Sequence, residues 1–181
     1  MELTSQQTLP VSQAIAWEAL NNTAVLQASI PGCDSLASTG ENEYEVLLTA
    51  AIGPVKAKFK GKLKLADLQP PEAYTIHFEG QGGAAGHGKG SAKVRLEPTG
   101  ADETVLHYTA TAQVGGKIAQ IGSRLIDMAA QKMAGEFFAS FNKLLEEKYH
   151  PPEVPETDES GLEAEVEPAG LKARLKDWFK R

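Results

Sequence analysis

The chain has 181 residues, of which 41% are hydrophobic and 23% charged, a composition typical of one globular domain with a substantial core. Acidic residues outnumber basic ones 24 to 18, and the net charge of −6 argues against nucleic-acid binding, which requires a basic face. The single cysteine, Cys33, excludes an internal disulfide and a multi-cysteine metal site. Because neither a secretory signal nor an apolar run of roughly 20 residues is visible, we expect a protein of the reducing cytoplasm.

The first predicted elements are a short strand and two short helices. Residues 3–9 read as a strand that Pro10 ends. Ser12 is a favourable N-cap for a helix over residues 13–20, and a second helix is predicted over residues 23–29. Pro31-Gly32 then stops the second helix.

Alternating apolar residues next predict an antiparallel meander. Residues 43–52 and 55–65 both alternate with a period of two, and Gly53-Pro54 between them marks a turn. Every second residue from Lys56 to Lys64 is a lysine, so this strand has one apolar and one basic face. The same alternation recurs over residues 74–78, 92–96 and 106–114, with turn residues between the runs.

The lysine row has two interpretations. A two-residue turn would place Glu45 opposite Lys62 and Glu43 opposite Lys64, while the first three lysines would face uncharged residues. We interpret the row as a solvated face. The alternative is a docking patch for an acidic partner or an anionic lipid.

Six glycines fall between residues 80 and 90. The segment from Gly83 to Lys89 nearly fits a phosphate-binding loop, but the alternating segment that follows predicts a strand, whereas such a loop must open a helix. We therefore interpret the segment as a hairpin with bulges. The functional alternative is a mobile lid over a cavity.

The apolar period changes after Gly115-Gly116. Apolar residues recur every three or four positions, which predicts one amphipathic helix over residues 118–148 that Pro151 ends. A sheet with one apolar face needs a cover, and this helix is the large candidate. The predicted fold class is α+β, a curved antiparallel sheet packed around a long C-terminal helix.

This order of elements resembles the helix-grip fold of the START-like (SRPBCC) superfamily. Four segments are similar to the family of carbon monoxide dehydrogenase G subunits, namely Ile30–Cys33, Ile52–Phe59, Gly86–Ala92 and Gly116–Ile126. The resemblance covers about residues 1–148. It implies a non-catalytic accessory protein that works with a molybdenum hydroxylase of the carbon monoxide dehydrogenase type and has a greasy cavity between helix and sheet.

The residues themselves also suggest a cavity. The face of the sheet that would meet the helix carries many small side chains, and small groups that face each other leave space unless the two layers approach. An apolar lining with few polar groups suits a lipid or a quinone. The predicted ligand-binding residues are Phe59, Ile76, Phe78, Val94, Leu96, Leu106, Tyr108, Leu125, Met128, Ala129, Met133 and Phe137. The plainer alternative is that the helix lies low on the sheet and these residues are ordinary core.

Catalytic and metal sites find little support in the sequence, and we predict neither. His77 and His107 fall on the strand face opposite the predicted core, and no pair of histidines has metal-ligand spacing. Cys33 has no identifiable base beside it, and we expect Arg124 and Asp127 to form an ion pair along the helix. A START-like hydrolase or cyclase would instead need polar groups that converge inside the cavity.

Composition divides the chain into three parts. Residues 1–150 form the predicted START-like ligand-binding domain. Residues 151–170 hold seven acids, four prolines and no base, which predicts a disordered acidic linker. Residues 171–181 place Leu171, Leu175, Trp178 and Phe179 on one side of a helix, opposite basic residues. That pattern predicts a membrane-binding helix made of Leu171, Lys172, Arg174, Leu175, Lys176, Trp178, Phe179, Lys180 and Arg181.

Together these features predict a hydrophobic-ligand carrier tethered to the inner face of the cell membrane. Its expected ligand is a respiratory quinone, menaquinone or ubiquinone, with no covalent cofactor, and its expected partner is the molybdenum hydroxylase. The alternative is a recruitment or maturation factor for that hydroxylase, with a filled core. A helix that docks on its own domain or on a partner protein is the alternative for the C-terminal segment.

Overall fold

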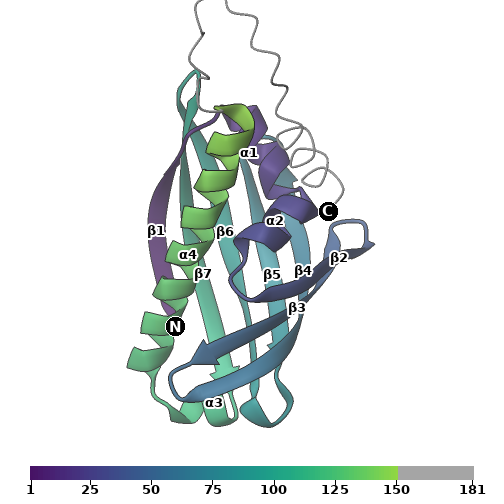
Figure 1. Ribbon diagram of the computed structural model, residues 1–181, viewed down its shortest axis with the longest axis vertical. Helices are drawn as coiled ribbons and strands as arrows, with labels where there is room; N and C mark the ends of the chain where they lie inside the picture. Colours follow the sequence, from purple (N-terminus) through teal and green to yellow (C-terminus); the bar gives the residue numbers. More distant parts are fainter. Residues whose placement is uncertain (151–181) are drawn as a thin grey trace, which may run out of the picture. The chain divides into compact units, whose positions relative to one another are not determined.

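The computed structural model describes residues 1–150, which form an α+β fold (Figure 1). Seven strands make one antiparallel sheet, and the long helix α4 crosses one of its faces. The elements in chain order are β1 (Glu2–Leu9), α1 (Gln13–Leu20), α2 (Thr23–Ser29), β2 (Cys33–Gly40), β3 (Glu43–Ile52), β4 (Val55–Gln69), β5 (Ala73–Gln81), the 3₁₀ turn η1 (Gly83–Ala85), β6 (His87–Gly100), β7 (Glu103–Gly115), α3 (Lys117–Gln120) and α4 (Ser123–Tyr149). This architecture confirms the predicted fold class.

The sheet order is β1-β7-β6-β5-β4-β3-β2, so the meander from β2 to β7 is closed at one edge by the first strand. The sheet curves around α4, with α1 and α2 beside the C-terminal part of that helix (Figure 1). The register of β3 and β4 agrees with the prediction, because Glu45 lies opposite Lys62 and Glu43 opposite Lys64. The lysines therefore line the outer face of the sheet, and the alternate apolar residues face α4.

The helix starts follow from local side-chain chemistry. The Ser12 hydroxyl accepts a hydrogen bond from the backbone N–H of Ile15 at 3.4 Å, as the predicted N-cap requires. The Asn22 side chain caps α2 in the same way, accepting from the N–H groups of Ala24 and Val25. Both short helices have the predicted boundaries.

Two sequence predictions about the elements are wrong. Strand β2 was not predicted, because its polar and small residues alternate poorly, and only pairing with β3 makes it a strand. The single predicted helix over residues 118–148 is two helices, since the chain turns at Gly122 with a φ of 96°. Glycine adopts this left-handed conformation without the steric strain of a side chain, so α4 begins only at Ser123.

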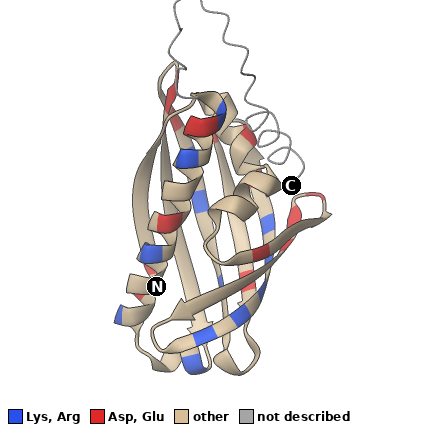
Figure 2. Ribbon diagram, in the orientation of Figure 1, with Lys and Arg blue, Asp and Glu red and all other residues tan. Residues whose placement is uncertain are grey.

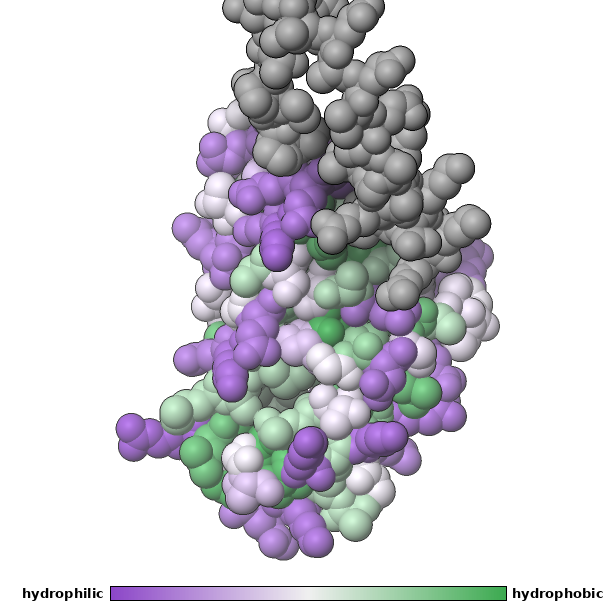
Figure 3. All heavy atoms as spheres, in the orientation of Figure 1, coloured by the Kyte–Doolittle hydropathy of each residue, from purple (hydrophilic) through white to green (hydrophobic). Residues whose placement is uncertain are grey.

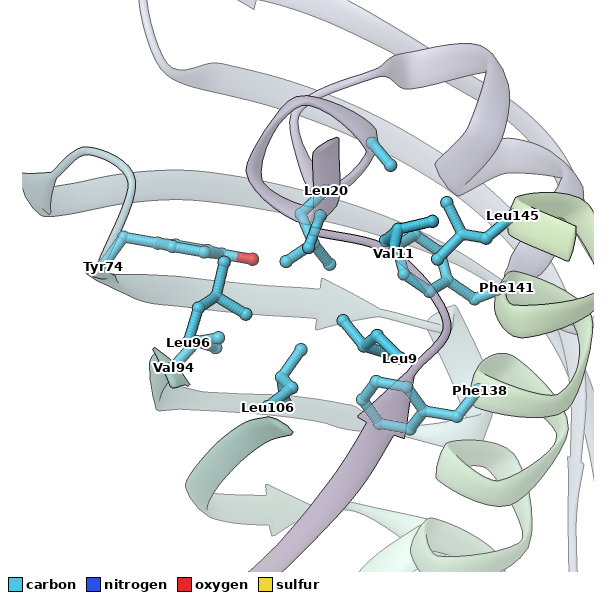
Figure 4. Close-up of a cluster of buried hydrophobic side chains, with 12 residues drawn as sticks. Leu9, Val11, Leu20, Tyr74, Val94, Leu96, Leu106, Phe138, Phe141 and Leu145 are labelled. Carbon is cyan, nitrogen blue, oxygen red and sulfur yellow. The ribbon is translucent and has the colours of Figure 1, made fainter. Parts of the chain in front are cut away.

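The packed core lies toward the C-terminal end of α4. It contains Phe141 and Leu145 of α4 and Leu9 of β1, each at most 1% exposed. These side chains pack with Val11 and with Leu20 of α1 (Figure 4). The buried Thr104 hydroxyl donates to the carbonyl of Val11 at 2.8 Å, which satisfies both groups. Within residues 1–150, no helix is both long and apolar enough to cross a bilayer.

Candidate ligand-binding site

The inner face of the sheet is set by strand register. Phe78 lies opposite Leu63 on one side and Gly90 on the other, and Gly90 lies opposite Ala112. Side chains that are directly opposite in register share a face of the sheet. The inward residues of the central strands thus include the predicted small ones, among them Gly61, Gly80, Ala92 and Ala110.

The inner face has a filled half. Val94, Leu96 and Leu106 are 7%, 3% and 2% exposed and pack with the side chains of α1 and the C-terminal part of α4. Figure 4 shows all three inside this cluster, below the ring of Tyr74. Protein side chains already occupy much of the space around them, and their assignment to a ligand stays a prediction.

The other half of the inner face is not closed. Ile76 packs against the filled half, but Phe59 and Phe78 point inward from the middle of the sheet and each keeps part of its surface exposed. If α4 lay flush on the sheet, these central positions would be as buried as Leu106. The backbone of α4 instead approaches mainly α2 and β1 and, less closely, α3 and β3. We call this incompletely filled apolar region between α4 and the sheet the open half.

Two glycines deepen the open half. A Cβ atom added to Gly82 would lie 2.5 Å from Cε1 of Phe59, and one added to Gly90 would lie 2.9 Å from Cζ of Phe78. The ring of Phe59 therefore lies against Gly82, just beyond the end of β5, and the ring of Phe78 lies against Gly90 of β6. In the sequence these glycines stand out only as a turn-forming cluster. A glycine next to a phenylalanine on the inner face is the sequence feature that could have predicted the open half.

Helix α4 contributes residues to both halves, and it meets Tyr108 of β7 at the boundary between them. Tyr108 and Phe137 lie at the boundary, where Tyr108 stacks on Phe138 and Phe137 stacks on Phe141, both with ring centroids 5.6 Å apart. Met133 and Ala129 lie nearer the start of the helix and are partly buried. Ile126, which sequence reasoning missed, is 8% exposed on the buried side of the helix's first turns.

Two of the predicted binding residues lie on the surface. Leu125 is 42% exposed and Met128 is 58% exposed, so neither is enclosed by the described residues. Both belong to the first two turns of α4, where Gly122 has reset the direction of the helix. The structure therefore places Leu125 and Met128 at the edge of the open half.

One carboxylate lies among the apolar residues at the start of α4. The expected ion pair between Arg124 and Asp127 does not form, and the Oδ1 atom of Asp127 is buried without a hydrogen-bond partner among the described residues. A buried oxygen of this kind costs free energy unless water or a ligand donates to it. It is a single polar group, so no pair of groups for acid–base chemistry is assembled with it.

The remaining candidate chemical groups lie apart from one another. Burial raises the pKa of the Cys33 thiol, which donates to the carbonyl of Ser35 at 3.4 Å, so the nucleophilic thiolate is disfavoured. His107 contacts Glu97 at 2.8 Å on the outer face, and His150 contacts the carbonyl of Pro10 at 2.6 Å. Residues 1–150 contain no cluster of three or more metal-ligating side chains.

The outer face of the sheet carries two hollows of about 990 and 570 Å³. The larger is walled by charged side chains of both signs, among them Lys62, Lys64 and Glu79. Lys60 contacts Glu45 at 3.4 Å and Lys64 contacts Glu43 at 3.9 Å, and all four side chains are largely in solvent. Charged side chains line both hollows, including Lys93 and Arg95 at the smaller one, whereas sites for lipophilic molecules carry few polar groups.

The glycine-rich segment is the hairpin that connects β5 and β6. It forms the single turn η1 over Gly83–Ala85 and then enters a strand, so no helix presents its amide groups to a phosphate. The acidic linker over 151–170 and the membrane-binding residues of 171–181 lie outside the described residues, and those predictions stay predictions.

Comparisons with known proteins agree with this architecture. No curated protein matches the chain. Among solved structures, a conserved protein from Geobacillus kaustophilus is 30% identical, with a TM-score of 0.78 over 82% of this chain and 97% of its own. A START superfamily protein from Mycobacterium smegmatis is 10% identical, with a TM-score of 0.62 over 81% of this chain and 98% of its own.

The Zhui aromatase/cyclase from Streptomyces sp. R1128 is 12% identical, with a TM-score of 0.59 over 82% of this chain and 94% of its own. At such identities the likeness to the cyclase and to the START protein establishes the shared fold alone. The family model of the carbon monoxide dehydrogenase G subunits (CoxG) matches residues 6–146, which include both halves of the inner face. The chain therefore belongs to the CoxG family of carbon monoxide dehydrogenase G subunits, with the helix-grip fold of START-like proteins.

Proposed function

We propose that this protein is a non-catalytic carrier that binds a respiratory quinone, menaquinone or ubiquinone, in the open half. The observation that carries the proposal is the partly exposed apolar inner face around Phe59, Phe78 and Met133. Ligand sites are typically concave and apolar with few polar groups. Among the described residues, Asp127 is the one charged group with a buried, unpartnered oxygen.

The proposed partner is a molybdenum hydroxylase of the carbon monoxide dehydrogenase type, in keeping with the family. The enzyme would pass two electrons to the bound quinone, which takes up two protons and becomes the quinol. The carrier would then exchange the quinol for a quinone at the inner face of the cell membrane. No step requires a reactive group of the carrier itself, which fits the dispersed positions of its cysteine and histidines.

Membrane attachment is assigned to residues 171–181. A basic helix with a Leu, Trp and Phe side would bind the interface of an anionic leaflet reversibly. Deletion of residues 171–181 should abolish flotation with anionic vesicles and leave the melting temperature unchanged, and Trp178→Ala should weaken flotation. Equal flotation of the full and the shortened chain would refute the tether.

The carrier proposal is tested by extraction of the purified full chain with organic solvent and mass spectrometry of the extract. We expect a prenylated quinone, and we expect added menaquinone or ubiquinone to raise the melting temperature of the ligand-free protein. If no lipophilic molecule is recovered and neither quinone binds, the carrier is refuted. A ligand-free chain that still co-purifies with the hydroxylase would be a recruitment or maturation factor.

A further inference from the structure

Three connections lie together at one end of the domain, namely the β3–β4 turn, the β5–β6 connection and the segment that leads from β7 through α3 into α4. The β3–β4 turn meets the helices, since a Cβ atom on Gly53 would lie 3.5 Å from Cδ1 of Ile121 and 3.8 Å from Cδ1 of Leu125. The β5–β6 connection meets the β7–α3 connection, where a Cβ atom on Gly116 would lie 2.7 Å from Cα of Gly86. We call this end, formed by residues 52–58, 82–88 and 115–128, the loop pole.

The loop pole is almost free of acidic residues, although the chain as a whole is acidic. Its one acidic residue is Asp127, and residues 46–66, 80–96 and 104–126, which supply most of the loop pole and its flanking strands, contain no Asp or Glu. The basic residues of the loop pole are Lys56, Lys58, Lys117 and Arg124, and all four are exposed. Figure 2 shows these basic segments at the lower end of the domain.

The opposite pole has the reverse character. Its turns and its helix end carry Glu72, Asp102, Glu103, Glu146 and Glu147, against the single basic residue Lys148 in the last turn of α4. The domain therefore has a charge difference along its long axis. Such a difference orients a protein in front of a negatively charged surface, with the basic end leading.

The loop pole also exposes apolar side chains. Leu125 and Met128 are two of the four large apolar residues exposed in the described part of the chain. The adjoining turn is Ile52-Gly53-Pro54-Val55, which has no charged residue. Figure 3 shows apolar residues gathered where the β3–β4 hairpin meets the start of α4. Exposed apolar groups rimmed by basic ones match the interface of an anionic bilayer, where the apolar groups enter and the cations meet headgroups.

We infer that, once residues 171–181 hold the chain at an anionic membrane, the loop pole docks on that membrane and places the open half next to the bilayer. Ile126 and Met133 on α4 connect the exposed Leu125 and Met128 with the interior. A lipophilic molecule would therefore pass between bilayer and protein along apolar side chains instead of through water. This inference deepens the proposed carrier function and rests on it for its purpose, but the docking itself requires no bound ligand.

The first experiment locates the docking surface in the full-length chain. A fluorophore sensitive to polarity (NBD) is attached through Pro54→Cys in a Cys33→Ser background, and Ala101→Cys at the opposite pole provides the matched control. With vesicles of phosphatidylcholine and phosphatidylglycerol, we expect the emission of the label at position 54 to shift to shorter wavelength and resist iodide quenching. The label at position 101 should stay in water. A label at position 54 that remains aqueous on vesicle-bound protein would overturn the inference.

The second experiment compares two leucines with the same exposure. Leu125 at the loop pole is 42% exposed and Leu47 on the outer face of the sheet is 41% exposed. In the full chain we expect Leu125→Glu to slow menaquinone uptake from anionic vesicles about tenfold, because a carboxylate at an anionic interface opposes insertion, and Leu47→Glu to leave uptake unchanged. Melting temperatures of both variants verify folding.

The outcomes separate the two proposals. If no quinone binds in detergent or in vesicles, the carrier function fails, and the label at position 54 still reports whether the loop pole enters the bilayer. If quinone binds in detergent but Leu125→Glu and Leu47→Glu take it up equally fast from vesicles, the docking surface fails alone. A shift of the label caused by the hydroxylase but not by vesicles would assign the loop pole to the protein partner and would also overturn the inference.

Discussion

The filled half and the open half of the inner face differ in how closely the side chains of the sheet and of the covering helices pack. In the filled half, Phe141, Leu9 and Leu106 come from a helix and two strands, and each is at most 2% exposed. In the open half, alanines and glycines make up much of the inner face, and the rings of Phe59 and Phe78 lie against Gly82 and Gly90. Close packing in one half can hold the helix at a fixed height, which leaves the other half unfilled.

Apolar residues of the inner face therefore fall into two groups with different roles. Residues of the filled half stabilise the fold by excluding water. Residues of the open half forgo part of this stabilisation and remain available to a ligand. Substitutions of the same type in the two halves should therefore have different consequences, and the following predictions test that division from the largest expected effect to the smallest.

Removal of a ring separates the two halves most strongly. Phe141→Ala should lower the free energy of unfolding by about 3–5 kcal/mol, because it leaves a cavity in a fully buried site. Phe78→Ala should lower it by only about 1–2 kcal/mol, since the ring is already partly exposed. Urea unfolding monitored by circular dichroism measures both values, and equal losses would contradict the division.

Larger side chains should be tolerated in the open half and not in the filled half. Ala16 is fully buried in the filled half, so Ala16→Leu should destabilise the protein by about 1–3 kcal/mol through overpacking. Ala110 faces the open half, and Ala110→Leu should change stability by less than about 1 kcal/mol while it weakens ligand binding. Thermal unfolding and quinone titration of the two variants provide the test. A strongly destabilised Ala110→Leu would mean that the open half is packed.

The position of the Phe59 ring should be adjustable through Gly82. Gly82 has an ordinary φ of −119°, so Gly82→Ala adds no backbone strain, but its Cβ must displace the ring toward the helix. We expect quinone affinity to fall about tenfold, equivalent to about 1.4 kcal/mol, with little loss of stability. The double variant Gly82→Ala/Phe59→Leu should regain affinity, because the shorter side chain clears the added methyl group. Failure of this rescue would show that the ring does not limit the ligand space.

The smallest effect concerns Tyr74, at the edge of the filled half. Burial raises the pKa of its hydroxyl above the ordinary value, so the folded state retains the proton when the unfolded chain has lost it. Its contribution to stability is therefore complete below about pH 10 and is lost as the pH rises further. Tyr74→Phe should reduce the decline in unfolding free energy between about pH 9 and pH 11. An unchanged decline would show that solvent reaches the hydroxyl.

Local patterns predicted a large part of the fold. Alternation predicted the inward and outward faces of β3 to β7, and the turn at Gly53-Pro54 predicted the register that places Glu43 opposite Lys64. Side-chain capping by Ser12 predicted the start of α1. These features depend on neighbours in sequence or directly across a hairpin, so they can be read without knowledge of the rest of the chain.

Strand β2 and the break before α4 depended on tertiary structure. The weak pattern of Cys33–Gly40 becomes a strand only beside β3. The apolar period continues through Gly122, and the loop pole, where α3 packs against η1, determines that the chain turns there.

The sequence likewise predicted which residues lie on the inner face of the sheet, but it did not predict the division of that face into a filled half and an open half. Alternation identified Val94 and Phe78 as inward residues, but the two have the same pattern. Cover by α1 and the C-terminal part of α4 decided that Val94 is enclosed and Phe78 is not, and this cover depends on the packing of α4 with β1, α1 and α2, which lie far from it in sequence. The sequence by itself determined which residues face inward. Only the tertiary structure decided where the inward residues meet, because a gap between two layers is a property of their separation and not of either layer's pattern.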